Sequence, residues 1–330
     1  MKSVLKYKIK KFVPERLWFV LGKQNKKKQD FFNSELKMHY GNKNVGIEIY
    51  IIRRRPPGGG LFSNVGHVLQ GLIYAESKNM HPVIDMKNYA TEYSRIRAFN
   101  GTRNAWEYFF HPVSCTSLSE AYESKNVLLS EGERILKNHF MSGRNLSYVL
   151  DRDNLQEVHR IYEKYIRLNA FSKSYIEYIV LNKEIEEDFT LGVFLRGNDY
   201  IKRPATGHPI QPEIENVMND ISKFIDDNPI KKIFLSTDDA EIRKKMRSKF
   251  GQLILDDIRS DSNSAFSNHL RRQFHLPSGS ISRNISYLSE IYILSKLKYT
   301  IAGLSNGSAM MLTINGARFQ AGKIYYLGVN

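Results

Sequence analysis

The sequence predicts an α/β protein of two domains, of which the second is built on a doubly wound parallel sheet. Two observations carry this prediction. The chain has 330 residues, roughly twice the usual length of one domain. In its last third, short apolar runs alternate with amphipathic stretches, which is the pattern of strands and helices in such a sheet. We therefore expect a basic amphipathic segment at 1–42, an α/β domain at 43–187 and a Rossmann-like domain at 188–330, the two domains facing each other.

The first domain is expected to open with a strand at 45–52, because this stretch is rich in β-branched residues. RRRPPGGG at 53–60 ends the strand, since Pro and Gly interrupt regular structure. A helix follows from Ser63 or Asn64, and HPVIDM at 81–86 is the next strand, so the order is that of a βαβ unit. A strand at 126–129 and helices at 153–168 and 173–181 complete the domain, and the charged turn at 182–188 is the expected boundary.

The second domain shows the alternation more regularly. Its expected strands are 190–195, 232–236, 253–255, 299–302 and 324–327, and its expected helices are 212–226, 240–250, 282–297 and 305–314.

Composition narrows the cellular setting. The single cysteine, Cys115, excludes an intrachain disulfide and a multi-cysteine zinc site. It suits a reducing compartment, so the expected location is the cytoplasm. The net charge of +15 is concentrated in residues 1–28, which hold ten Lys or Arg, one Glu, and interleaved Trp and Phe. Such a segment can lie on an anionic membrane surface; a solvated tail and a nucleic-acid contact are the alternatives.

Polar residues follow several of the predicted strands, where ligands bind in parallel sheets. Arg196 comes after 190–195, Asp238 and Asp239 after 232–236, Asp256 after 253–255, and Ser305 and Asn306 after 299–302. A guanidinium can bind a diphosphate with two parallel hydrogen bonds. The backbone N–H groups at a helix start can bind phosphate oxygens, and a carboxylate such as Asp256 can accept from a purine edge or a ribose hydroxyl.

Ordinary structural roles are open for most of these residues. Asp238, Asp239 and Ser305 could each serve only as a helix N-cap, a position that favours Asp and Ser. The glycines at 58–60 could form only a turn, and His67 and His208 could be core or capping residues. Arg196 is the residue least suited to a purely structural role, because it ends an apolar strand.

These positions also carry a resemblance to a known family. GGGLFSNVGH at 58–67, WEYFFHPVS at 106–114, LRGND at 195–199 with HPI at 208–210, FLSTDD at 234–239, LSEIYILS at 288–295 with LS at 304–305, and IYYLG at 324–328 occur in order. The chain resembles the α1,6-fucosyltransferases, of the animal core and rhizobial nodulation types, within the wider fucosyltransferase superfamily. The resemblance covers about 45–330.

The resemblance implies a GT-B fold, GDP-fucose as donor, inversion at the sugar carbon, and neither a cofactor nor a metal ion. It implies that Arg196 contacts phosphate, with Asp199 as the nearest carboxylate for a base. The nucleotide-sugar contacts are then Gly59, Gly60, Asn64, His67, Arg196, Asp238, Asp239, Asp256, Ser305 and Asn306. The domain at 43–187 would serve the glycan acceptor, in surface polysaccharide or lipid-linked oligosaccharide synthesis or in protein glycosylation.

Four positions depart from the family pattern. Phe194 replaces a histidine, Gly197 a second arginine and Tyr200 a lysine, while Pro204 stands where a carboxylate is proposed as the base.

The alternatives are a transferase for another nucleotide sugar, an inactive family member, or a basic membrane- or nucleic-acid-binding protein. No nucleic-acid partner is expected, because the motif-bearing rim is rich in Asp; peripheral association with the inner membrane face through residues 1–28 is the expected partner interaction.

Overall fold

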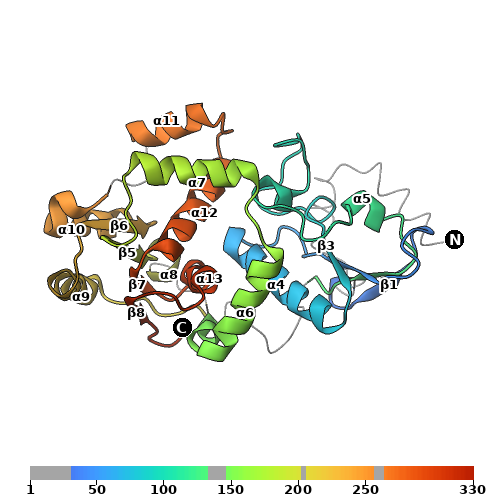
Figure 1. Ribbon diagram of the computed structural model, residues 1–330, viewed down its shortest axis with the longest axis horizontal. Coiled ribbons are helices and arrows are strands. Elements are labelled where there is room, and N and C mark those ends of the chain that lie inside the picture. The colour runs from blue at the N-terminus through green and yellow to red at the C-terminus, as the bar shows by residue number, and fades with distance from the viewer. Residues whose placement is uncertain (1–30, 133–145, 202–205, 256–263) are drawn as a thin grey trace. The chain divides into compact units, whose positions relative to one another are not determined.

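The computed structural model describes residues 31–132, 146–201, 206–255 and 264–330, and gives only the backbone of Asn198 and Asp199. The chain forms two compact units (Figure 1). The first holds the described residues of Met1–Asn138 and Lys164–Asn169, and the second those of His139–Glu163 and Ala170–Asn330. The predicted basic segment falls mostly on residues 1–30, which lie outside the described residues.

The first unit is built on a sheet in the order β1-β4-β2-β3. Strand β2 pairs in parallel with β3 and with β4, whereas β1 pairs antiparallel with β4. The unit's elements are β1 (Leu36–Met38), β2 (Ile49–Ile52), α4 (Leu61–Ser77), β3 (His81–Ile84), η1 (Ala105–Tyr108), α5 (Leu118–Ala121) and β4 (Val127–Leu129). The predicted βαβ unit is therefore present as β2-α4-β3.

The second unit is built on a parallel sheet in the order β6-β5-β7-β8. Its strands are β5 (Thr190–Leu195), β6 (Lys232–Thr237), β7 (Tyr299–Gly303) and β8 (Ala321–Tyr325). Its helices are η2 (Leu146–Leu150), α6 (Arg152–Tyr165), α7 (Ala170–Asn182), α8 (Asn198–Ile201), α9 (Ile214–Asp227), α10 (Ala240–Phe250), η3 (Gly251–Leu253), α11 (Ala265–Gln273), α12 (Ser280–Lys296) and α13 (Asn306–Asn315).

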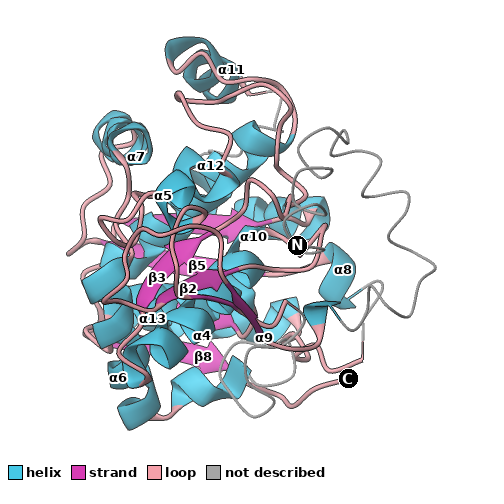
Figure 2. Ribbon diagram, turned by 90° about the vertical axis from the view of Figure 1, so that its right-hand side faces the viewer, coloured by secondary structure: helices cyan, strands magenta, loops and turns pink. Residues whose placement is uncertain are grey.

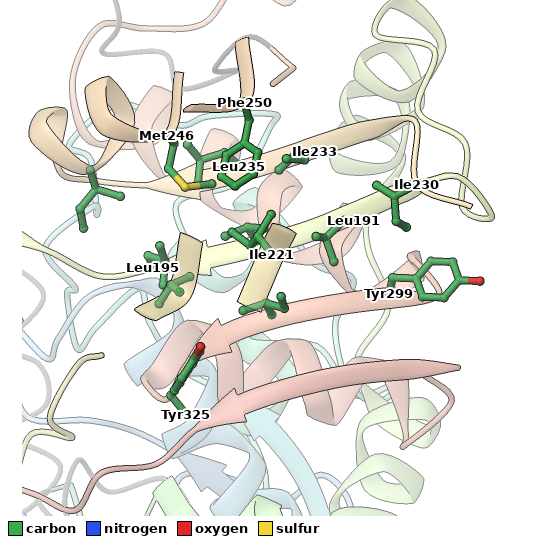
Figure 3. Packing of buried hydrophobic residues seen from close by; sticks show 14 residues of the cluster. Leu191, Leu195, Ile221, Ile230, Ile233, Leu235, Met246, Phe250, Tyr299 and Tyr325 are labelled. Carbon is green, nitrogen blue, oxygen red and sulfur yellow. The ribbon is translucent and has the colours of Figure 1, made fainter. Parts of the chain in front are cut away.

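Helices cover both faces of this sheet, as the predicted doubly wound arrangement requires. On one face Leu191 and Leu195 of β5 pack with Ile221 of α9 and Met246 of α10 in one apolar cluster (Figure 3). On the other face Gly192 leaves room for α12, because a Cβ there would lie 2.7 Å from Leu294 Cδ2. Helices α9 and α10 flank one side of the strands in Figure 1, and α12 and α13 the other. Figure 2 shows the same helices around β5.

The boundary between the units differs from the predicted boundary at 187/188. Helix α7 and most of α6 group with the second unit. The reason is their packing: the ring of Tyr175 in α7 lies 4.9 Å from that of Phe274, and its hydroxyl lies 3.3 Å from Ser286 Oγ of α12. From α6, His159 Nδ1 lies 2.8 Å from the carbonyl oxygen of Thr313 in α13.

Several predicted elements differ in detail. Residues 253–255 do not form a strand; they contribute a single bridge, Ile254 to Ile233, after the turn η3. Strand β8 begins at Ala321 and ends at Tyr325, so both of its ends come earlier than those of the predicted 324–327. Strand β2 begins only at Ile49, because residues 45–47 are exposed. Strand β1 and helix α11 were not predicted. Among the described helices, none combines the length and apolar composition that a membrane crossing needs.

Candidate functional site

Arg196 stands at the carboxyl end of β5, one of the two inner strands of the second unit's sheet. Every residue of β5 is buried, so the strand fixes the point at which the arginine leaves the sheet. The Arg196 side chain keeps 18% of its surface exposed. It is thus held by the protein and still accessible to a ligand.

Asp238 holds this arginine from the neighbouring strand. Its Oδ2 lies 3.0 Å from Arg196 Nη1, and its Oδ1 accepts the backbone N–H of Gly197 at 2.9 Å. A carboxylate that binds a guanidinium and a backbone donor together fixes both in direction as well as in distance. Asp238 therefore supports the arginine rather than acting only as a helix cap.

Gly197 and Asp239 lie in direct contact beside this ion pair. A Cβ on Gly197 would stand 2.3 Å from Asp239 Cβ, a distance that real atoms do not adopt. Asp239 Oδ1 accepts the N–H groups of Glu241 and Ile242, so this residue is the N-cap of α10. The glycine that stands in place of the family's second arginine is thus required by the close approach of the two strand ends.

The turn after β7 forms the second part of the rim. Ser305 is the N-cap of α13 in a capping box: its N–H donates to Ser308 Oγ at 2.8 Å, and its own Oγ accepts from the N–H of Ser308. Ser305 is 1% exposed, and Asn306, the first residue of the helix, is half-buried. A ligand at this helix start would accordingly meet Asn306 rather than the Ser305 hydroxyl.

Phe194 lies beneath this turn. It is fully buried, and a Cβ on Gly307 would stand 2.7 Å from its Cζ and 2.3 Å from the Tyr287 hydroxyl. Where the family has a histidine, this chain therefore has an apolar support for the first turn of α13. A phenyl ring has no hydrogen-bond donor or acceptor to offer a nucleotide at that position.

A third group of residues joins these two parts of the rim and was not predicted as part of the site. Tyr200 of α8 lies beside Arg196, with the guanidinium carbon 5.4 Å from the ring centroid. Gln211 Nε2 donates to the carbonyl oxygen of Leu304, next to Ser305, at 2.8 Å. The HPI motif at 208–210 was the available sequence signal, since it lies between these two contacts.

The first unit carries its own predicted site residues around the start of α4. Asn64 is fully buried, and its amide is used inside the loop. Its Oδ1 accepts from Arg54 Nη1 at 2.7 Å and from the N–H of Gly59 at 3.3 Å, while its Nδ2 donates to the Gly59 carbonyl at 2.6 Å. Gly60 is the N-cap of α4 and provides no side-chain cap. Asn64 therefore shapes the glycine loop, and Arg54 is the residue that the predicted set lacked.

His67 is buried one turn further along α4. Its Nε2 lies 2.9 Å from the carbonyl oxygen of Arg53. Burial, assisted by the positive charge of Arg54, lowers the pKa of His67 to about 4. The ring is thus neutral at physiological pH and ties the end of β2 to α4, which is the structural role left open by the sequence.

Arg53, between β2 and this loop, is buried as completely as the core. It is 1% exposed, and its guanidinium carbon lies 4.1 Å from the centroid of the Phe31 ring and 5.4 Å from that of Tyr89. Its Nε donates to the carbonyl oxygen of Ser130 at 2.7 Å. The three successive arginines at 53–55 are consequently not one basic patch, because the first of them points into the protein.

The side chains of two predicted site residues cannot be placed. Asp256 lies outside the described residues, and Asp199 is described by its backbone alone. Pro204, the noted departure from the family pattern, also lies outside the described residues. In the described part of the chain no group of three or more His, Cys, Asp or Glu is arranged to hold a metal ion.

The structure brings together Arg196, Asp238 and Asp239 on one part of the second unit's rim, with Ser305 and Asn306 on the other. Gly59, Gly60, Asn64 and His67 gather in the first unit.

Comparison with known proteins gives similar solved structures only. The chain matches no family model and no curated protein. It is similar to NodZ α-1,6-fucosyltransferase soaked with GDP-fucose, at 16% identity and a TM-score of 0.47 over 81% of this chain and 92% of that one. NodZ from Bradyrhizobium, at 15% identity, gives 0.46 over 82% and 92%. A mutant of Arabidopsis thaliana FUT1 in complex with GDP, at 11%, gives 0.46 over 96% and 78%. Because each TM-score is below 0.5, residue roles have to come from the geometry of this chain.

Proposed function

We propose that this chain is a fucosyltransferase that moves fucose from GDP-fucose to a hydroxyl group of a glycan acceptor, with inversion and without a metal ion. The observation that carries the proposal is Arg196, held by Asp238 at the carboxyl end of β5 in the same unit as the capped start of α13. The order of family motifs along the sequence supports the choice of donor.

The chemistry follows from the leaving group. In the transfer, an acceptor oxygen attacks the anomeric carbon as the bond to the diphosphate oxygen breaks, and the diphosphate leaves with the electron pair. Negative charge therefore develops on the diphosphate, and a positioned guanidinium stabilises that charge without reorganising during the reaction. The partial positive charge of the α13 start acts in the same direction.

The proton of the acceptor hydroxyl needs a destination. We assign it to Asp199, which is in α8 three residues after Arg196. Direct loss to solvent, with little base assistance, is the alternative. Asp238 and Asp239 suit the role less, because the first holds Arg196 and the second caps α10.

The acceptor is proposed to be a surface-polysaccharide precursor or a lipid-linked oligosaccharide. The support is the charge of residues 1–28, whose ten Lys or Arg with interleaved aromatic residues suit the anionic inner face of a membrane. This would make the protein a cytoplasmic enzyme that associates peripherally with the membrane. A vesicle flotation assay tests the association: binding to anionic vesicles, lost when residues 1–28 are deleted, supports it.

The test of the activity compares two arginines of the same unit. Arg196→Ala should lower the turnover of GDP-fucose by about 100- to 1000-fold, the usual effect of losing one preorganised donor to developing negative charge. Arg272→Ala, at an exposed position in the last turn of α11, should have no effect. Turnover at the wild-type rate by Arg196→Ala would refute the assignment. Thermal stabilisation by a UDP-sugar alone, and not by GDP-fucose, would refute the donor.

A further inference from the structure

Three flat groups contact one another on the rim of the second unit, with Tyr200 touching both of the others. The guanidinium carbon of Arg196 lies 5.4 Å from the centroid of the Tyr200 ring. The Tyr200 ring in turn stacks on His208, with centroids 4.8 Å apart and planes 25° from parallel. Tyr200 is 6% exposed. Its neighbours therefore cover the Tyr200 ring almost completely.

Tyr200 is fixed to the strand end by its backbone. Its N–H donates to the carbonyl oxygen of Gly197 at 2.9 Å, which closes the short helix α8 directly after β5. This short helix places the Tyr200 ring beside Arg196, the residue before Gly197. The family pattern has a lysine at this position, so the aromatic ring is a feature of this chain.

His208 is held in place independently of Arg196. Its carbonyl oxygen accepts the N–H of Asn330 at 2.9 Å, and the N–H of Ile210 donates to the carbonyl oxygen of Gly328 at 3.0 Å. Further along the same segment, Gln211 Nε2 donates to Leu304, just before the α13 cap. The histidine is therefore anchored to the end of the sheet and connected to the other part of the rim.

We propose that Tyr200 and His208 are positioning residues that set the plane of the Arg196 guanidinium for the diphosphate. The proposal rests on the proposed function of Arg196. The ring of Tyr200 attracts the guanidinium, and the stack on His208 holds that ring in place. Asp238 fixes one edge of the guanidinium. Together the ion pair and the stack define both its direction and its tilt.

The test separates the ring from its polar groups. Tyr200→Leu and His208→Leu should each lower kcat for GDP-fucose about tenfold, the effect of losing one such contact. Tyr200→Phe and His208→Phe keep the stack and should lose less than threefold. An equal loss in the Phe and Leu variants would overturn the proposal, because the hydroxyl or the imidazole nitrogens would then be responsible.

A double-mutant cycle tests whether the effect passes through Arg196. In an Arg196→Ala background, Tyr200→Leu should cause little further loss of GDP affinity measured by calorimetry, because the group that it positions is absent. A full additive loss would overturn the proposal. Urea unfolding of each variant shows whether it is folded. If one Leu variant is unstable, the other Leu variant is compared with wild type and in the Arg196→Ala background instead.

The same unit offers a matched control. Tyr178 and His269 form another Tyr–His stack, with centroids 5.8 Å apart and planes 28° from parallel, away from the rim residues in sequence. Tyr178→Leu should leave GDP affinity and kcat unchanged, and a loss equal to that of Tyr200→Leu would count against a specific role. If the wild-type chain binds no GDP and turns over no GDP-fucose, the proposed function itself fails. If it does both and the Leu variants equal it, only the positioning role fails.

Discussion

Asp238 binds Arg196 across the ends of two neighbouring strands, with 3.0 Å between its Oδ2 and Arg196 Nη1, and the same carboxylate accepts the N–H of Gly197. The pair has one positive and one negative charge. In the proposed function this pair would therefore contribute mainly orientation to diphosphate binding, since the nearby carboxylate repels the same ligand that the guanidinium attracts.

Asp238→Asn should separate these two effects. The amide keeps the volume and can still accept from Gly197, but it loses the charge-assisted bond to Arg196. We expect kcat for GDP-fucose to fall about tenfold, as for one hydrogen bond to a charged group, while the donor KM stays equal or falls. Steady-state kinetics measure the split. Asp227→Asn, at the exposed end of α9, is the control, and a rise in KM with constant kcat would contradict the expectation.

Gly197→Ala should destabilise the second unit. The added Cβ would lie 2.3 Å from Asp239 Cβ, so the end of β5 or the N-cap of α10 has to move. Such overpacking costs about 1–3 kcal/mol in the free energy of unfolding. Urea denaturation measures it, and Gly46→Ala, where nothing lies within 4 Å of the added atom, should change stability by less than about 0.5 kcal/mol. Equal stability of the two variants would show that the rim accommodates a side chain.

The sequence predicts elements best where burial and periodicity agree. Strand β5 and helix α10 have their predicted bounds, because one is a continuous apolar run and the other begins at an Asp N-cap. Residues 253–255 have the same apolar character, yet they form only one bridge to Ile233. The first residues of β8 were missed because its second and third positions are exposed and carry no apolar run, and their pairing with β7 makes them a strand. Local pattern does not contain the tertiary pairing that decides these cases.

The site shows the same limit at the level of side chains. The sequence identifies Arg196 and Asp238 as rim residues, but their ion pair depends on β5 and β6 being neighbours in the sheet. Asn64 has the residue type of a ligand contact, and only its hydrogen bonds to Arg54 and Gly59 show that it shapes a loop. Tyr200 was noted only as a departure from a family pattern, because its stack on His208 joins residues from two segments.

The Ser305 cap should matter for both stability and donor binding. Ser305→Ala removes the N-cap of α13, which costs about 1 kcal/mol of unfolding free energy. We also expect weaker GDP binding by calorimetry, because the turn that presents the first N–H groups of α13 loses its fixed shape. Ser264→Ala removes the N-cap of α11 and should cost a similar amount of stability with unchanged GDP affinity. Weaker GDP binding in both variants would point to a general loss of stability.

His67 should make the first unit sensitive to acid. Burial lowers its pKa from the ordinary 6.5 to about 4 in the folded chain, so between these two values the unfolded chain binds more protons than the folded chain. Stability is therefore full above pH 6.5 and is lost as the pH falls toward 4. A shift of about 2.5 pH units corresponds to a loss of about 3 kcal/mol by pH 4.

His67→Gln removes the titration while keeping a side-chain N–H that can donate to the Arg53 carbonyl oxygen. Its unfolding free energy, measured by urea denaturation from pH 7 to pH 4.5, should therefore fall less steeply than that of the wild type. His39, whose Nδ1 lies 2.5 Å from the Lys125 carbonyl oxygen at an exposed position of the same unit, provides the matched control. His39→Gln should keep the wild-type slope. A wild-type slope in His67→Gln would mean that other groups, and not the buried ring at the start of α4, govern the acid sensitivity of this unit.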